Sequence, residues 1–151
     1  MSALGVVALV LGILVFTALM FVLLMIPISR RLRRMGAEME DEMGPGERAE
    51  NVRGLGLESR GPKQLRGNGR LVLTHDELRF RMLVPDRETV IPLASVIDVG
   101  AEKTWLGKWV GRRLFRVRWR TPDGGADAMA WEVRDLDAWV AAVQGAAEAT
   151  R

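Results

Sequence analysis

The sequence lacks cysteine and contains a single histidine, and these two shortages exclude several kinds of site. Without cysteine there is no disulfide, no thiolate metal ligand and no cysteine nucleophile. The one histidine, His75, precedes an aspartate in a stretch typical of a tight turn, and turn polarity accounts for it. No serine or acidic residue stands in a pattern that would complete a catalytic triad. We therefore expect neither an enzyme nor a bound metal or cofactor.

The chain also lacks a large excess of charge of one sign. Its 151 residues include 22 lysines and arginines and 19 aspartates and glutamates, for a net charge of +3. The two signs are mostly intermixed along the chain. A protein that binds DNA or RNA through phosphate contacts usually carries a larger and segregated positive charge. We therefore expect no nucleic-acid partner.

One long segment lacks charge altogether. The 25 residues Leu4–Ile28 include no Asp, Glu, Lys or Arg. A helix that rises about 1.5 Å per residue would make this segment ~37 Å long, whereas the hydrocarbon core of a bilayer is ~30 Å thick. We therefore expect residues 1–29 to form a single transmembrane helix.

A cleaved signal peptide is the alternative interpretation, and it would make the remainder an exported domain. Three features argue against cleavage. No positive residue precedes the apolar run, and the run exceeds the usual length of about 7–15 residues. No small-x-small cleavage sequence precedes Arg30. The membrane anchor is the better interpretation.

Four arginines follow the apolar run directly and indicate its orientation. These residues are Arg30, Arg31, Arg33 and Arg34. Positive charge accumulates on the cytoplasmic side of membrane proteins, so the N-terminus is expected outside and the C-terminal part in the cytoplasm. The expected location is the inner (cytoplasmic) membrane. The same cluster can also lie against anionic lipid headgroups.

Residues 30–65 read as a basic and then acidic juxtamembrane linker. A short helix is compatible with the charged residues as far as about Met43, where Gly44-Pro45-Gly46 ends it. Beyond that point further glycines and Pro62 interrupt every periodic apolar pattern. With nothing to bury, this part is expected to be a flexible tether.

From Gly67 onward the apolar residues alternate with polar ones, which is typical of strands. The predicted strands are Arg70–Thr74, Glu77–Leu83, Glu88–Pro92, Ala94–Gly100, Leu114–Arg120 and Ala128–Val133. Leu136, Trp139 and Val143 then follow helical spacing, with Asp135 as the N-cap. The predicted fold is an N-terminal single transmembrane α-helix plus a small mainly-β domain over residues 66–147. That domain is an antiparallel barrel of six or seven strands capped by one C-terminal helix, with a tail at 148–151.

Four short motifs within this domain resemble the pleckstrin-homology (PH)-like and GRAM-like domains of membrane-anchored bacterial proteins. They are Gly69-x-Leu71-x-Leu73-Thr74, Leu78-x-Phe80, Ile91-Pro92-Leu93-x-x-Val96 and Asp135-x-x-x-Trp139. The resemblance covers about Arg66 to Ala147, and it implies a lipid-, peptide- or protein-binding module without catalytic activity. Inositol-lipid binders of this family carry basic residues around the first hairpin loop. That loop is expected here at Thr74–Glu77, where it is acidic, which argues against inositol lipids.

The segment between the fourth predicted strand and the last hairpin is the candidate binding site. Its basic and aromatic residues are Lys103, Trp105, Lys108, Trp109, Arg112 and Arg113. Lysine and arginine beside exposed tryptophan suit a membrane interface or an anionic ligand. The alternative is that both tryptophans pack on the barrel and the charges are only solvated.

A second candidate is a basic sheet face. Arginines alternate with apolar residues on two predicted strands, and they are Arg79, Arg81, Arg116, Arg118 and Arg120. Cross-strand acids such as Glu88, Asp127 and Glu132 would neutralise this face by pairing with them.

The function expected from the sequence is therefore non-enzymatic. A single-pass membrane protein presents a cytoplasmic domain that binds a protein partner or associates with copies of itself. The alternative is an anionic lipid headgroup sensor that acts through Lys103–Arg113.

Overall fold

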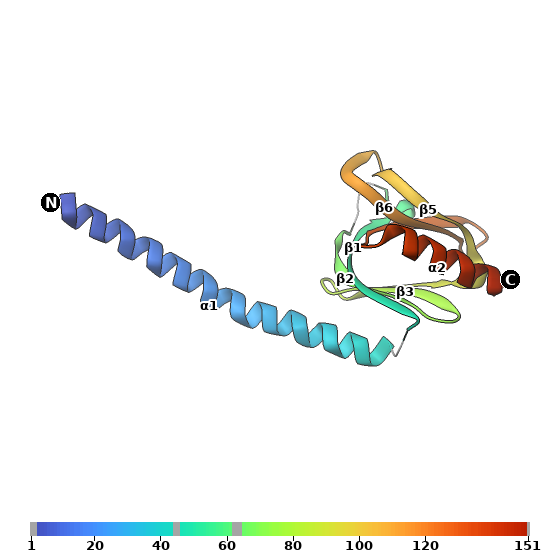
Figure 1. The fold of residues 1–151 in the computed structure, drawn as a ribbon, viewed down its shortest axis with the longest axis horizontal. Helices are drawn as coiled ribbons and strands as arrows, with labels where there is room; N and C mark the ends of the chain where they lie inside the picture. Colours follow the sequence, from blue (N-terminus) through green and yellow to red (C-terminus); the bar gives the residue numbers. More distant parts are fainter. Residues whose placement is uncertain (1–2, 44–45, 62–64, 151) are drawn as a thin grey trace. The chain divides into compact units, whose positions relative to one another are not determined.

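The computed structural model of the chain describes residues 3–43, 46–61 and 65–150. The chain separates into two parts, an N-terminal helix and a β domain with a C-terminal helix. Figure 1 shows both parts. Each part is described by itself below.

Helix α1 runs without a break from Ala3 to Met43. Its segment Leu9–Pro27 is long and apolar enough to cross a membrane, by length and composition. The described side chains of this segment are exposed. Pro27 is accommodated inside the helix. The predicted apolar helix is confirmed, and so is its extension through the charged residues to Met43.

The β domain contains seven strands in the part of the chain that the structure describes. They are β1 (Arg48–Leu57), β2 (Gly67–Leu73), β3 (Glu77–Met82), β4 (Arg87–Pro92), β5 (Val96–Trp105), β6 (Lys108–Arg120) and β7 (Ala126–Glu132). All neighbours pair antiparallel in one curled sheet of order β4-β3-β2-β1-β7-β6-β5. Two short 3-10 turns, η1 (Glu58–Arg60) and η2 (Leu93–Ser95), follow β1 and β4. The curled antiparallel sheet with one C-terminal helix confirms the predicted fold class.

Helix α2 (Leu136–Ala149) covers the concave side of the sheet, as Figure 1 shows. Its start is fixed by Asp135, whose carboxylate accepts a hydrogen bond from the Ala138 N–H at 3.1 Å. Trp139, Val143 and Ala147 form the buried stripe that packs on the sheet. The predicted cap and apolar stripe are both confirmed. The helix continues through Ala149, so the predicted tail at 148–151 is wrong for its first two residues.

The main core lies between this helix and the concave face of the sheet. Phe80, Phe115, Trp131 and Trp139 are its largest fully buried members, and Trp131 has an edge contact with Phe80 at 6.0 Å between ring centroids. Trp131 and Trp139 both stack at a tilt against Phe115. Aromatic pairs of this kind stabilise a core beyond the area that they bury.

A second and smaller apolar cluster lies on the opposite face of the sheet. Its buried members are Leu55, Trp105, Leu114, Ala128 and Ala130. Adjacent residues of a strand point to opposite faces, and the chain neighbours Phe115, Met129 and Trp131 belong to the main core. The sheet is therefore apolar on both faces at this place.

Strand β1 corrects the predicted domain boundaries. Residues 30–65 were expected to be a flexible linker, but Arg48–Leu57 lie in the middle of the sheet, paired with β2 and β7. The glycines that suggested flexibility serve close packing instead. A Cβ at Gly54 would lie 2.7 Å from the Phe80 ring and 2.9 Å from the Met129 Cε atom. The domain therefore begins near Arg48, and the boundary predicted at residue 66 is wrong.

This strand also moves the first hairpin loop. The predicted first loop, Thr74–Glu77, is the connection from β2 to β3. The first loop is the β1–β2 connection, which begins with η1 and contains Arg60. The acidic composition of Thr74–Glu77 therefore carries no argument about the ligands of the first loop.

Candidate membrane-contact site

The segment Lys103–Arg113, called the hairpin tip below, is the end of the β5–β6 hairpin. It was expected to be a loop between the fourth strand and the last hairpin, but both of its sides are strand. Leu106 and Gly107 form the turn, with φ of 52° and 75°, and Trp105 pairs with Lys108 across it. Positive φ at both central residues suits the right-handed twist of a two-residue hairpin. In Figure 1 the hairpin, drawn in yellow and orange, projects beyond the body of the domain.

Trp105 holds the hairpin tip to the domain. It is only 5% exposed and packs in the second cluster with Leu55 and Leu114. Its indole Nε1–H donates a hydrogen bond to the Gly56 carbonyl oxygen at 3.2 Å. Trp105 was predicted as a residue that contacts lipid or a partner, and its burial contradicts that role. It positions the residues around it.

Trp109 has the opposite environment. Its side chain is 75% exposed, more than any other large apolar residue of the described chain. Lys103, Lys108, Arg112 and Arg113 are exposed on the same hairpin tip. Among the described residues none of these four cations forms an ion pair. The structure therefore brings one exposed tryptophan and four unneutralised cations together.

The proposed basic sheet face is largely neutralised by acids. Arg79 lies 2.7 Å from a Glu88 oxygen, and Arg81 donates two hydrogen bonds of 2.9 Å to Asp86. The hydrogen bond from Arg81 lowers the pKa of the Asp86 carboxyl. Arg116 forms ion pairs with Asp98 and Glu102.

Asp127 does not pair with an arginine as expected. It is buried, and its carboxylate accepts hydrogen bonds from the Ser59 backbone N–H at 3.0 Å and the Ser59 hydroxyl at 2.7 Å. This interaction ties η1 to β7. Arg118 and Arg120 remain exposed on β6.

The structure also places the predicted topology residues and the histidine. Arg30, Arg33 and Arg34 are exposed on α1, whereas the side chain of Arg31 lies outside the described residues. His75 lies exposed in the β2–β3 connection, 3.9 Å from Asp76. In the described ranges no three His, Cys, Asp or Glu residues lie close enough together to hold a metal ion.

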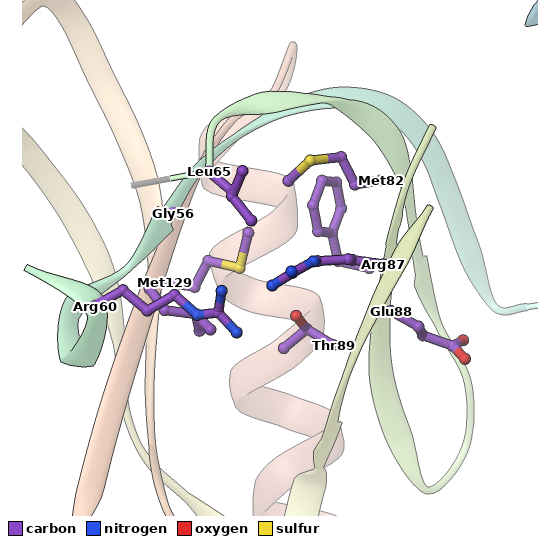
Figure 2. A pocket seen from close by; sticks show the side chains of 10 residues that line it. Gly56, Arg60, Leu65, Met82, Arg87, Glu88, Thr89 and Met129 are labelled. Carbon is purple, nitrogen blue, oxygen red and sulfur yellow. The ribbon is translucent and has the colours of Figure 1, made fainter. Parts of the chain in front are cut away.

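A pocket of about 100 Å³ opens between β1 and β4. Figure 2 shows its lining. Its apolar wall consists of Leu57, Leu65, Phe80, Met82 and Met129. Arg60 and Arg87 extend over the opening from opposite sides. Neither guanidinium has an ion-pair partner within the described part of the chain.

Sequence reasoning missed this pocket because it missed β1. Arg60 lies in the predicted linker and Arg87 lies between two predicted strands, so nothing in the sequence suggested that they meet. A weak signal was present in the alternation of Val52, Gly54 and Gly56, all buried on β1, with exposed Arg53. Two of these positions are glycine, which hides the apolar pattern.

No protein-family model matches the chain, and no curated protein matches it. The assignment of a function therefore rests on the geometry of the β domain.

Proposed function

We propose that the chain is a non-enzymatic, single-pass membrane protein whose β domain is a PH-like binding module. The order of seven antiparallel strands followed by a C-terminal helix supports this relationship. The apolar segment Leu9–Pro27 supports the membrane anchor. Arg30, Arg33 and Arg34 at its C-terminal side favour a cytoplasmic β domain in the inner membrane.

The hairpin tip is the surface by which this domain contacts the anionic membrane. The observation that carries this proposal is the exposure of Trp109 beside Lys108 and Arg112. Tryptophan is favoured at the headgroup level of a bilayer. There the apolar part of its ring system faces the hydrocarbon and its indole N–H faces water. Each lysine or arginine near an anionic surface adds about 1 kcal/mol of attraction. Contact by the hairpin tip would hold the domain in one orientation on the bilayer.

Vesicle flotation of residues 46–151 tests this contact. We expect the fragment to float with vesicles that contain phosphatidylglycerol and to stay behind with neutral ones. Lys108→Glu combined with Arg112→Glu should weaken binding at least tenfold, because two attractive charges become repulsive. Trp109→Ser should weaken it as well.

The matched control reverses two arginines at the other end of β6. Arg118→Glu with Arg120→Glu changes the net charge equally and leaves the hairpin tip intact. Equal loss in both double variants would mean that only net charge matters. Absence of binding by the unmodified fragment at moderate salt would refute the proposal.

A further inference from the structure

The pocket between β1 and β4 combines an apolar wall with two arginines that lack an acidic partner in the described chain. Its volume of about 100 Å³ is that of roughly three or four water molecules. Sites that enclose a whole cofactor or drug-sized ligand are larger, at about 300–1,000 Å³. The space suits a single aliphatic side chain. Arg60 and Arg87 lie at its opening. Because guanidinium groups bind carboxylates strongly, the ligand should also carry a negative charge close to that aliphatic side chain.

Strand β4 lies at one end of the sheet order and borders this pocket. The Leu93 N–H bonds to the Asp76 carbonyl at 2.8 Å, in the same register as the β3–β4 pairs. Hydrogen-bonded pairs alternate along an antiparallel ladder, so Arg87, Thr89 and Ile91 bond to β3. The backbone groups of Glu88 and Val90 therefore face away from the sheet.

The hydrogen bonds between β3 and β2 lead independently to the same assignment of the outward-facing residues of β4. The Leu83 N–H bonds to Asn68 and the Thr74 N–H bonds to Glu77, which sets the alternation between β2 and β3. The intervening β3 residues must then bond to β4. Among the described residues β4 has only β3 as a pairing partner, so its outer edge can take another strand.

We propose that the pocket and the outer edge of β4 together bind an extended segment of a partner protein. The segment pairs with the backbone of Glu88 and Val90. A residue opposite Thr89 points to the same side of the sheet as Thr89, which lines the pocket. That residue is apolar and fills the pocket. A second residue, two positions away on the same side, is Asp or Glu and meets Arg87 and Arg60.

This inference goes beyond the membrane contact, since it uses a different surface and names the chemistry of a protein partner. Selection of a phage-displayed library of random linear dodecapeptides tests it. The target is the full chain in nanodiscs of neutral lipid, in which the hairpin tip has no anionic surface to bind. The expected consensus is an apolar residue followed or preceded at two positions by an acidic one.

Variants then separate the two parts of the site, with fluorescence anisotropy of a selected peptide as the measurement. Arg60→Glu with Arg87→Glu should weaken binding at least tenfold, whereas Arg118→Glu with Arg120→Glu should leave it unchanged. Val90→Pro removes an outward N–H, and we expect about a tenfold loss that Val90→Thr does not cause. Where the charge reversals abolish cooperative melting, Arg60→Gln with Arg87→Gln replaces them.

Three results would overturn the inference. The first is a selection without an enriched consensus. The second is enriched peptides that bind every variant equally well. The third is a charge reversal at Arg60 and Arg87 that lowers binding to anionic vesicles while no peptide binds, which would make the pocket a lipid site. The first two results leave the membrane contact of the hairpin tip untouched, because the hairpin-tip variants do not alter the pocket. The third would add a second lipid-binding surface to the domain.

Discussion

At the scale of single residues, two tryptophans of one hairpin have opposite tasks. Trp105 is buried against Leu55 and Leu114 and bonded to the Gly56 carbonyl. Trp109, four positions later, is the most exposed large apolar residue of the described chain. Burial of one gives a rigid base from which the other is presented, so their substitutions should have separable effects.

Trp105→Ala should destabilise the domain by about 3 kcal/mol, because loss of a buried tryptophan leaves a cavity. Trp109→Ala should change the free energy of unfolding by less than about 0.5 kcal/mol, as is usual for exposed positions. Urea unfolding followed by circular dichroism measures both. Equal destabilisation by the two substitutions would contradict the assignment of Trp105 as the anchor of the hairpin tip.

Glu50 on β1 is a second residue with a defined structural task. Its carboxylate accepts hydrogen bonds from the Trp139 Nε1–H at 2.7 Å and the Arg134 backbone N–H at 2.8 Å. Arg48, two positions earlier, stacks over the Trp139 ring at 5.1 Å. These contacts join β1 to the start of α2.

Glu50→Ala leaves the buried Trp139 N–H without its partner, and we expect a loss of about 1–3 kcal/mol. Glu47→Ala, at an exposed neighbouring glutamate, is the control and should leave the free energy of unfolding almost unchanged. Thermal melting measures the difference between the two variants. A change of about 1 kcal/mol in the free energy of unfolding shifts the melting midpoint by ~4–8 °C in a domain of this size. Matching midpoints for the two variants would refute the role of Glu50.

At the scale of elements, β1 is the strand that holds the β domain together. It lies between β2 and β7 and joins the two halves of the sheet. Without it, β2–β4 and β5–β7 would each present an unpaired edge, and Glu50 would no longer hold α2. The β domain should therefore fold only when Arg48–Leu57 are present.

We expect residues 46–151 to unfold cooperatively and residues 66–151 to show no cooperative transition. The comparison requires only urea titration of the two fragments by far-ultraviolet circular dichroism. A cooperative transition of similar midpoint in the shorter fragment would show that β1 is dispensable.

The sequence predicted the later strands and α2 because alternation and helical spacing are direct consequences of burial on one face. Phe80 and Met82 on β3, or Trp139 and Val143 on α2, are apolar at the expected intervals. Strand β1 was not predicted because the sheet packs tightly at Gly54, where only glycine fits beside Phe80. A position that is buried by close approach carries no hydrophobic signal.

The sequence identified the residues of the candidate site but did not predict which of them are buried and which are exposed. Charge and aromatic content identified Lys103–Arg113 as a candidate. Which tryptophan is buried depends on the second cluster, whose members Leu55 and Ala128 lie far from Trp105 in the sequence. The pocket below Arg60 and Arg87 depends in the same way on the pairing of β1.

At the scale of the whole molecule, the chain has less flexible linker than its composition suggests. Helix α1 extends to Met43 and β1 begins at Arg48, so only residues 44–47 separate the two elements. The β domain therefore follows the long apolar helix closely along the chain. If α1 spans a membrane as proposed, a module attached in this way would meet lipid headgroups at high effective concentration, and weak contacts would suffice.

A reporter fused after Arg151 should be active in its cytoplasmic form and inactive in its periplasmic form. The reason is the cluster of arginines that follows the apolar segment. Replacing Arg30, Arg31, Arg33 and Arg34 by serine should give a mixed orientation. Periplasmic activity of the unmodified fusion would overturn the orientation.

The proposed contact between the hairpin tip and the bilayer can be tested directly in the full chain, because the absence of cysteine allows single labelling. Thr104→Cys places a spin label on the hairpin tip, and Ala126→Cys places one at the exposed start of β7 as the control. In anionic proteoliposomes we predict that the label at 104 is shielded from an aqueous relaxation agent and accessible to oxygen, while the label at 126 shows the reverse. Equal aqueous accessibility of both labels would contradict the proposed membrane contact.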